Sequence, residues 1–161
     1  MEETKKKKYK LNVDAAYLRG ISQGGAILRN NNGELIWAVA FHLCSKSSEE
    51  AEVRALVQAT EMAMAEGFVD VQVETDAMRS LTLLQNEIGN HGGLTDFRQE
   101  ALGRSYTFEH VLREGNGPAH SLAAHPVGQA LCVRFDQVGS LPNQVKMNYY
   151  ADLFGIPRFR L

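Results

Sequence analysis

The sequence of 161 residues has few of the residues that build disulfide-rich or membrane-spanning proteins. It contains two cysteines and four prolines, and no apolar run approaches the roughly 18 residues of a membrane span. The first ten residues, MEETKKKKYK, lack the apolar stretch of a secretory signal. We therefore expect a reduced intracellular protein, cytoplasmic or nuclear, with no membrane partner and with Cys44 and Cys132 as small core residues.

The net charge is also small, but the charged residues are unevenly distributed along the chain. The net charge is -2, with 44% hydrophobic and 22% charged residues, values typical of one soluble globular domain. Residues 1–10 carry five lysines against two acids, and residues 138–161 carry three basic residues against one acid. Residues 11–137 carry nine basic residues against sixteen acids. The acidic body disfavours binding of nucleic acid by surface charge alone.

Alternation of apolar and polar residues predicts strands in the first part of the chain. Residues 9–14 alternate cleanly and predict a half-buried strand that ends on Asp14. Two apolar runs follow, QGGAILRN and ELIWAVAF, and the Asn-Gly pair between them is a strong hairpin signal. These three segments predict an antiparallel sheet.

A long helix and a fourth strand follow. Ser47 and Glu50 have capping-box spacing, and the helix they begin should end at Gly67. Residues 69–76 alternate again and end on Asp76. A strand, a long helix and another strand form a crossover unit, which predicts that the fourth strand is parallel to an earlier one.

The rest of the chain predicts further helices and one more strand. The expected segments are a short helix at 77–87, a helix at 94–103, a strand at 106–114 and a last helix at 119–136. Residues 138–161 contain two prolines and read as a mostly irregular tail, with a short helical turn around 148–154. We divide the chain into a basic extension (1–8), a domain (9–137) and this tail.

Three acids are placed where they can meet. Glu52 falls on the helical stripe of Ala55, Leu56 and Ala59, which should face the sheet, and a carboxylate there is costly unless paired or bound to a cation. Asp14 and Asp76 close strands, where ligand sites are common in open α/β sheets. Three oxygen ligands on rigid elements suit Mg²⁺ or Mn²⁺.

Each acid also has an ordinary structural explanation. Glu52 lies near the first turn of its helix, where it can reach solvent or pair with an arginine. Asp76 precedes a predicted helix and suits an N-cap. Asp14, at a strand end, suits a turn. The sequence leaves both interpretations open.

Five blocks of the chain together resemble a known family. They are KLNVDAA, GGAILRNNNGELI, SSEEAEVRAL, VQVETD and HVLREGNGPAHSLA. In order and spacing they resemble the plant-type ribonuclease H-like domain, which is related to the RNase H of retrotransposon reverse transcriptases. The resemblance covers residues 9 to about 126. It implies an α/β ribonuclease H-like fold with a five-stranded mixed sheet, three antiparallel strands then parallel ones, flanked by helices.

The resemblance also implies an activity, cleavage of the RNA strand of RNA–DNA hybrids by two metal ions held by four acids. Asp14, Glu52 and Asp76 match the first three. His120 stands where the family usually has the fourth acid. Neutral imidazole is a poor ligand for Mg²⁺ and a better one for Mn²⁺, so we expect weak cleavage that favours Mn²⁺. Alternatively, His120 is a partly exposed residue at a helix start with no metal contact.

Other residues are candidates for contacts to nucleic acid. Gly24 and Gly25 permit close approach of a polynucleotide backbone, although simple hairpin geometry also explains them. Asn116 is in place by the resemblance. Lys7 and Lys8 belong to the dense basic run, which either steers polyanions or is a solvated end.

The sequence thus predicts a metal-dependent endonuclease of the RNase H type, with an RNA–DNA hybrid as its partner. The competing hypothesis is a catalytically impaired RNase H-like module that binds nucleic acid or a protein. His120 favours the second, and the three acids favour the first. The tail at 138–161 is a candidate for contact with a protein partner. His110, on the fifth predicted strand, lies near the place of a histidine that the family uses in product release.

Overall fold

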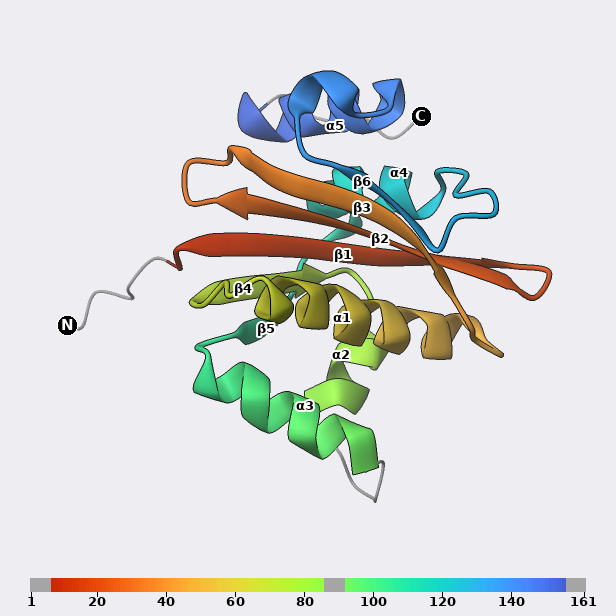
Figure 1. The fold of residues 1–161 in the computed structure, drawn as a ribbon, viewed down its shortest axis with the longest axis vertical. Helices are drawn as coiled ribbons and strands as arrows, with labels where there is room; N and C mark the ends of the chain where they lie inside the picture. The colour runs from red at the N-terminus through yellow and green to blue at the C-terminus, as the bar shows by residue number, and fades with distance from the viewer. Residues whose placement is uncertain (1–6, 86–91, 156–161) are drawn as a thin grey trace.

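The computed structural model describes residues 7–85 and 92–155. The strands within these residues form one six-stranded sheet in the order β5-β4-β1-β2-β3-β6 (Figure 1). The strands are β1 (Tyr9–Leu18), β2 (Ile21–Asn30), β3 (Leu35–Leu43), β4 (Val71–Thr75), β5 (Thr107–His110) and β6 (Cys132–Phe135). The helices are α1 (Ser48–Ala65), α2 (Met78–Gln85), α3 (Gly92–Gly103), α4 (Gly117–Ala123) and α5 (Asn143–Leu153), with 3-10 turns at Arg113–Asn116 and Val138–Ser140.

The predicted mixed sheet is confirmed for its first five strands. β1, β2 and β3 are antiparallel, whereas β4 is parallel to β1 and β5 is parallel to β4. The β2–β3 turn forms around Gly33, whose φ of 82° lies in the left-handed region. Asn30 Oδ1 accepts the backbone N–H groups of Asn32 and Glu34 there, both at 3.0 Å. The Asn-Gly hairpin signal therefore identified the correct turn.

The long helix begins and ends where the sequence predicts. Ser47 Oγ accepts the N–H of Glu50 at 3.1 Å, and Glu50 Oε2 accepts the N–H of Lys46 at 2.7 Å. The chain leaves the helix through Gly67, with φ of 83°. The apolar stripe of α1 is buried against the sheet, as expected; it consists of Ala55, Leu56, Ala59 and Ala63.

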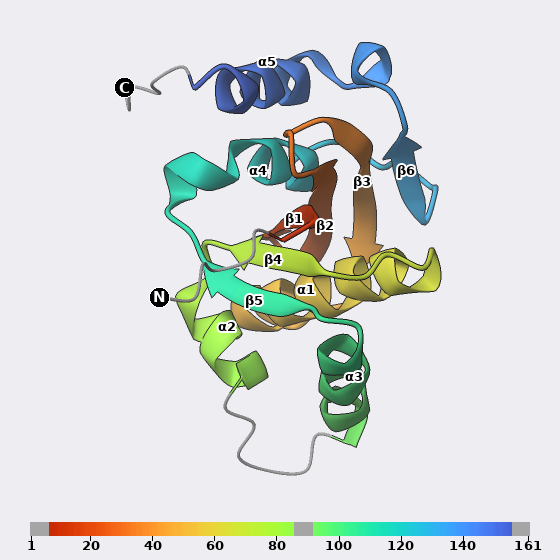
Figure 2. The same cartoon turned by 90° about the vertical axis from the view of Figure 1, so that its left-hand side faces the viewer.

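The sheet separates two helical layers (Figure 2). One face carries α1, α2 and α3, and the main core lies there around Leu11, Val13 and Trp37. The other face carries α4 and α5, with a smaller core that includes Ile27 and Leu122. Because side chains alternate along a strand, Leu11 and Val13 face α1 while Asn12 and Asp14 face the α4 side. Asp14 therefore points toward the less apolar layer, whereas Glu52 comes from α1 on the other face of the sheet.

The expected helix at 119–136 is wrong beyond Ala123. The chain turns at Pro126 and at Gly128, whose φ of 69° cannot continue a helix, and then forms β6. β6 pairs antiparallel with β3 from Ala38 to Phe41, which makes the sheet six-stranded rather than five-stranded. A four-residue edge strand has too short a pattern to be recognised without its partner.

The expectation of a mostly irregular tail is also wrong for residues 138–155. Helix α5 has 11 residues instead of a short turn, and it packs beside α4. Leu141, Val145 and Tyr149 are buried in the smaller core. The hydroxyl of Tyr149 accepts the N–H of Leu35 at 3.2 Å. Residues 138–155 thus share a core with the rest of the sheet.

Both cysteines differ from their expected place in the core. Cys44 and Cys132 are exposed free thiols. Cys44 directly follows β3, and Cys132 lies on the edge strand β6, so neither is covered by a second layer. Among the described residues, no helix has the length and apolar character needed to cross a membrane.

Candidate active site

Parallel pairing of β1 with β4 brings two of the predicted acids together. The register pairs Val13 with Thr75, so Asp14 and Asp76 come next on adjacent strands. The prediction that this strand ends on Asp14 is wrong. Strand β1 continues to Leu18 in its pairing with β2. Asp14 is nearly fully buried, at 4% exposure. Asp14 and Asp76 therefore lie directly after the last paired residues of β1 and β4, where this parallel pairing ends.

Glu52 reaches the same place from the first turns of α1. Its carboxyl pKa is raised to about 9, chiefly by burial, then by the charge of Asp14, a hydrogen bond with Asp14 and the charge of Asp76. Its Oε2 is buried and has no hydrogen-bond partner. The alternative of an arginine partner is not seen, since the nearby Arg54 pairs with Glu50 at 2.9 Å. Glu52 is half-buried and thus belongs to one group of carboxyls with the buried Asp14 and the half-buried Asp76.

Asp76 shows the same mutual effect more weakly. Its carboxyl pKa is raised by burial and by the charge of Asp14, and it is lowered in part by Arg113 and His120. The N–H of Ala77, just before α2, donates to Thr75 Oγ1 at 3.1 Å. Arg113, which the sequence left without a role, opens the 3-10 turn that follows β5. The site consequently combines three acids with two basic side chains.

His120 sits directly against Asp14. Its Nδ1 lies 2.9 Å from Asp14 Oδ2, and because a carboxylate can only accept, Nδ1 donates. This hydrogen bond raises the pKa of His120, although partial burial opposes the shift. The other oxygen of Asp14, Oδ1, accepts the N–H of Ala15 at 2.9 Å. The residue at the predicted fourth position therefore acts as a hydrogen-bond donor to Asp14.

The donor set suits a hard divalent cation. Carboxylate oxygens are the ligands that Mg²⁺ and Mn²⁺ prefer, and the orphaned Oε2 of Glu52 is a buried acceptor that a cation would satisfy. In the described part of the chain, however, no three His, Cys, Asp or Glu side chains form a ready-made metal cage. Burial is the main cause of the raised pKa of Glu52, and the charges of Asp14 and Asp76 add to it, as expected for acids that share one site. The residues therefore fit a divalent ion chemically.

The two glycines proposed to contact nucleic acid lie inside the fold. A Cβ on Gly25 would be 2.3 Å from the backbone N of Ala123 and 2.5 Å from the backbone O of Ala119, both in α4. A Cβ on Gly24 would be 2.3 Å from the ring of Phe41. Both glycines are buried, so the prediction that a polynucleotide backbone approaches them closely is wrong. Gly25, which is paired with Asp14, instead lets α4 press against the sheet and deliver His120.

Asn116 is also internal rather than part of a surface. Its Nδ2 donates to Val13 O at 2.9 Å, and its Oδ1 accepts Asn12 Nδ2 at 3.1 Å. The prediction of a direct nucleic-acid contact is therefore wrong for this fully buried side chain. Asn116 instead fixes the backbone one residue before Asp14.

A buried polar network, which the sequence did not reveal, extends from Asn12. Its side chain bonds Glu74 Oε1 at 3.0 Å and Arg29 Nη2 at 2.7 Å. Arg29 in turn lies 3.4 Å from Asp152 of α5. The C-terminal helix is thus connected through side chains to β1. No local sequence pattern predicts such a connection, because residues that bond directly in it are up to 123 positions apart.

The predicted lysines lie away from the acids. Lys7 Nζ is 3.2 Å from Asp70 and donates to Ser105 O at 2.9 Å, and Lys8 lies over the ring of Tyr9. They lie at the beginning of β1, whereas Asp14 is farther along the strand. The other lysines of the basic run, at positions 5 and 6, fall outside the described residues. By contrast, His110 pairs with Thr75 and therefore lies beside Asp76.

A family model described as reverse transcriptase-like matches residues 12–126, more than half of the sequence. This chain belongs to that family. The reverse transcriptase-like segment contains all four site residues, Asp14, Glu52, Asp76 and His120, and it ends before β6 and α5. None of the curated proteins matches the chain significantly. The resemblance to ribonuclease H-like domains is confirmed, while its plant-type character stays a prediction.

Solved structures of low sequence identity share the fold of this reverse transcriptase-like domain. RNase H1 from the archaeon Halobacterium salinarum matches with a TM-score of 0.59 and 22% identity, over 72% of this chain and 94% of that one. LC11-RNase H1 in complex with an RNA/DNA hybrid matches with a TM-score of 0.59 and 20% identity, over 71% and 93%. The N-terminal RNase H domain of a Mycobacterium tuberculosis protein matches with a TM-score of 0.60 and 18% identity, over 74% and 92%. The fold is therefore ribonuclease H-like.

Proposed function

We propose that this chain is a metal-dependent endonuclease that cleaves the RNA strand of RNA–DNA hybrids, and that His120 weakens its activity. The observation that carries the proposal is the group of the buried Asp14 and the half-buried Glu52 and Asp76, which come from three different parts of the chain and include a buried oxygen without a partner. A scaffold without a cationic ligand gains nothing from placing three acidic side chains together at a partly buried position. The hybrid in the LC11-RNase H1 complex supports the choice of substrate.

The chain's own residues divide the work in this proposal. Asp14, Glu52 and Asp76 would hold Mg²⁺ or Mn²⁺, and such ions stabilise the attacking and leaving oxygens of a phosphodiester. Arg113, which acts electrostatically on Asp76 and His120, adds positive charge for a phosphate group. His120 holds a proton at Nδ1 against Asp14 Oδ2 and so competes with a cation for that oxygen. Its competition is the reason to expect low activity.

Substitution at position 120 tests this function. With a labelled RNA–DNA hybrid and millimolar Mn²⁺, H120D should raise the cleavage rate about tenfold or more, because it restores an acidic ligand. D76N should abolish cleavage and serves as the control for a contaminating nuclease. Activity measured with Mg²⁺ should be lower than with Mn²⁺ in the unmodified chain. If H120D gains nothing while D76N still removes a measurable activity, position 120 is not the fourth site.

The second candidate is a non-catalytic RNase H-like module that binds nucleic acid or a protein. The hydrogen bond from His120 to Asp14 favours it, since this bond already occupies one oxygen of the most buried of the three acids. Such a module would show no cleavage in either variant and no rise in melting temperature with Mn²⁺. The intracellular location and a protein partner at the C-terminal region stay predictions.

A further inference from the structure

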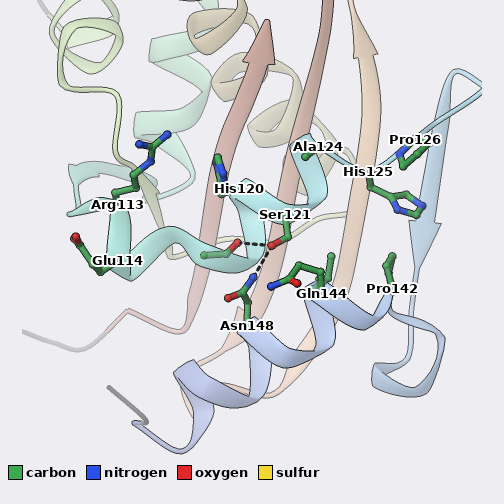
Figure 3. Close-up of a pocket in the computed structure, with 12 residues that line it drawn as sticks. Arg113, Glu114, His120, Ser121, Ala124, His125, Pro126, Pro142, Gln144 and Asn148 are labelled. Carbon is green, nitrogen blue, oxygen red and sulfur yellow. Dashed lines mark hydrogen bonds between the residues drawn. The ribbon is translucent and has the colours of Figure 1, made fainter. Parts of the chain in front are cut away.

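A groove lies between α4 and α5, on the face of the sheet toward which Asp14 points. It has a volume of about 650 Å³. Figure 3 shows His120, Ser121 and Ala124 on one wall, with Gln144 and Asn148 of α5 opposite. Because His120 both lines the groove and bonds to Asp14, the groove opens beside the proposed cleavage site. Helix α5 lies beyond the family-matched residues, so the second wall is an addition to the matched domain.

Hydrogen bonds hold the walls of this groove in place. Asn148 Nδ2 donates to Ser121 Oγ, which joins α5 to α4 across the floor, and Ser121 Oγ donates to Gly117 O at 3.1 Å. Gln23 Nε2 donates to the backbone oxygens of Ala123 and His125 at 3.1 and 2.7 Å. The groove is therefore a built feature of the fold rather than a gap between loosely packed helices.

The lining combines the groups that recognise single-stranded nucleic acid. Arg113 supplies a permanent positive charge, and Glu114 is the one acid among the lining residues. The His125 ring, held edge-on by Phe135 at 5.7 Å, offers a surface for stacking. The amide of Gln144 can donate to and accept from a base edge.

Apolar residues complete the lining with Pro126, Pro142 and Val145. A cavity of this volume is in the range of small-ligand pockets, roughly 300–1,000 Å³, and is far too small for a paired helix. A nucleic-acid strand bound at the acids continues past them, and the groove begins at His120, next to Asp14. The size, the charge and the stacking surfaces therefore all favour an unpaired strand.

We propose that the α4–α5 groove binds about one or two unpaired nucleotides of the strand that passes the acids. This proposal rests on the proposed nuclease function for the identity of that strand. It deepens that function, because it makes the preferred substrate a hybrid with a single-stranded overhang beside the cleaved bond. The basic N-terminal run is not needed for this contact.

Binding of a labelled six-nucleotide DNA strand in EDTA, measured by fluorescence anisotropy with the full chain, tests the groove without cleavage. A124L fills the groove from an exposed position and should weaken binding about fivefold or more. R113Q should lower the slope of log affinity against log salt by about 0.7. K146Q removes a positive charge from α5 outside the groove and should leave affinity and slope unchanged. If A124L lowers the melting temperature, Q144A on the exposed face of α5 replaces it, with the same expected loss.

The outcomes separate this proposal from the nuclease function. Equal affinity in A124L, Q144A and the unmodified chain overturns the groove as a strand site, as does an absence of binding in the unmodified chain. Cleavage that is equal for blunt and overhanging hybrids overturns the substrate preference, even where D76N shows that the nuclease is real. Groove-dependent binding with no cleavage by the chain or by H120D supports the strand site and overturns the nuclease.

Discussion

At the scale of single residues, the site is defined by three acids, two of which have a carboxyl pKa raised by burial and by their neighbours. Burial raises the pKa of Glu52 to about 9, with Asp14 and Asp76 adding to the shift. Glu50 and Glu52 are two residues apart on α1, about 200° around the helix axis, so their surroundings differ. Hydrogen bonds from the Lys46 backbone and from Arg54 lower the pKa of the exposed Glu50. Two glutamates on one helical turn therefore have opposite effects on stability.

This contrast predicts how stability depends on pH in EDTA. A carboxyl with a raised pKa in the folded state binds a proton that the unfolded chain releases above about 4.5, so the stability it confers falls as the pH rises from there toward 9. E52Q removes this loss, and its melting temperature should exceed that of the unmodified chain by an increment that grows between pH 5 and pH 8. The same variant should lose the stabilisation by Mn²⁺, because a ligand is gone.

The matched control is E50Q, which removes a carboxyl of lowered pKa. Its stabilising contacts with Arg54 and Lys46 are present above the ordinary pKa and are lost in acid, so E50Q should lower the melting temperature at pH 7 and matter less at pH 4. Thermal melts across this pH range measure both variants. A lower melting temperature for E52Q at pH 8 in EDTA would contradict the buried carboxyl group described here.

At the scale of elements, the position of α4 decides the fourth member of the site. The helix has seven residues, and Gly25 of β2 lets it approach the sheet so closely that His120 meets Asp14. The family resemblance predicted the places of Asn116 and His120 in the sequence. It could not supply the approach of α4 to β2, because this depends on residues about 100 positions apart.

We expect G25A to destabilise the fold and to disturb the site. Its Cβ would collide with the backbone of α4, which cannot move aside as a flexible side chain can, and such overpacking costs about 1–3 kcal/mol. Urea unfolding should show this loss. G103A is the control, because nothing lies within 4 Å of its Cβ and helical alanine is favoured over glycine by about 0.5–1 kcal/mol. Equal stability of the two variants would refute the close packing of α4.

At the scale of the whole molecule, α5 ties the C-terminal region to the strand that carries Asp14. The link runs from Asp152 through Arg29 and Asn12 to Asn116, and it ends on the carbonyl oxygen of Val13. Arg29 and Asp152 have side-chain exposures of 10% and 16%, so water screens their attraction only in part. The region first interpreted as a tail thus contributes to the support of the site.

Removal of this link should lower the free energy of unfolding more than removal of an exposed ion pair does. D152N leaves Arg29 without a charged partner near the core and should lower the free energy of unfolding by about 1–3 kcal/mol. D136N breaks the exposed pair with Arg134 and should change it by less than about 1 kcal/mol. Urea unfolding compares the two. A loss in D152N no larger than in D136N would mean that α5 is held by its apolar contacts alone.

The sequence by itself determined the features that depend on near neighbours. Alternation gave β1 and β4, the Asn-Gly pair gave the β2–β3 turn, and Ser47 with Glu50 gave the start of α1. It also indicated that Asp14, Glu52 and Asp76 would meet, because parallel strands bring their ends to one edge. Periods of two and 3.6 residues are local, and a single chain displays them without a partner.

Only the tertiary structure decided the features that require contact between distant segments. β6 exists by pairing with the free edge of β3, and α5 is ordered by burying Val145 and Tyr149 under the sheet. The bond between His120 and Asp14 and the groove above it join segments 106 positions or fewer apart in sequence but adjacent in space. Their free energy comes from burial and pairing that form only when the chain is folded, so no local pattern records them.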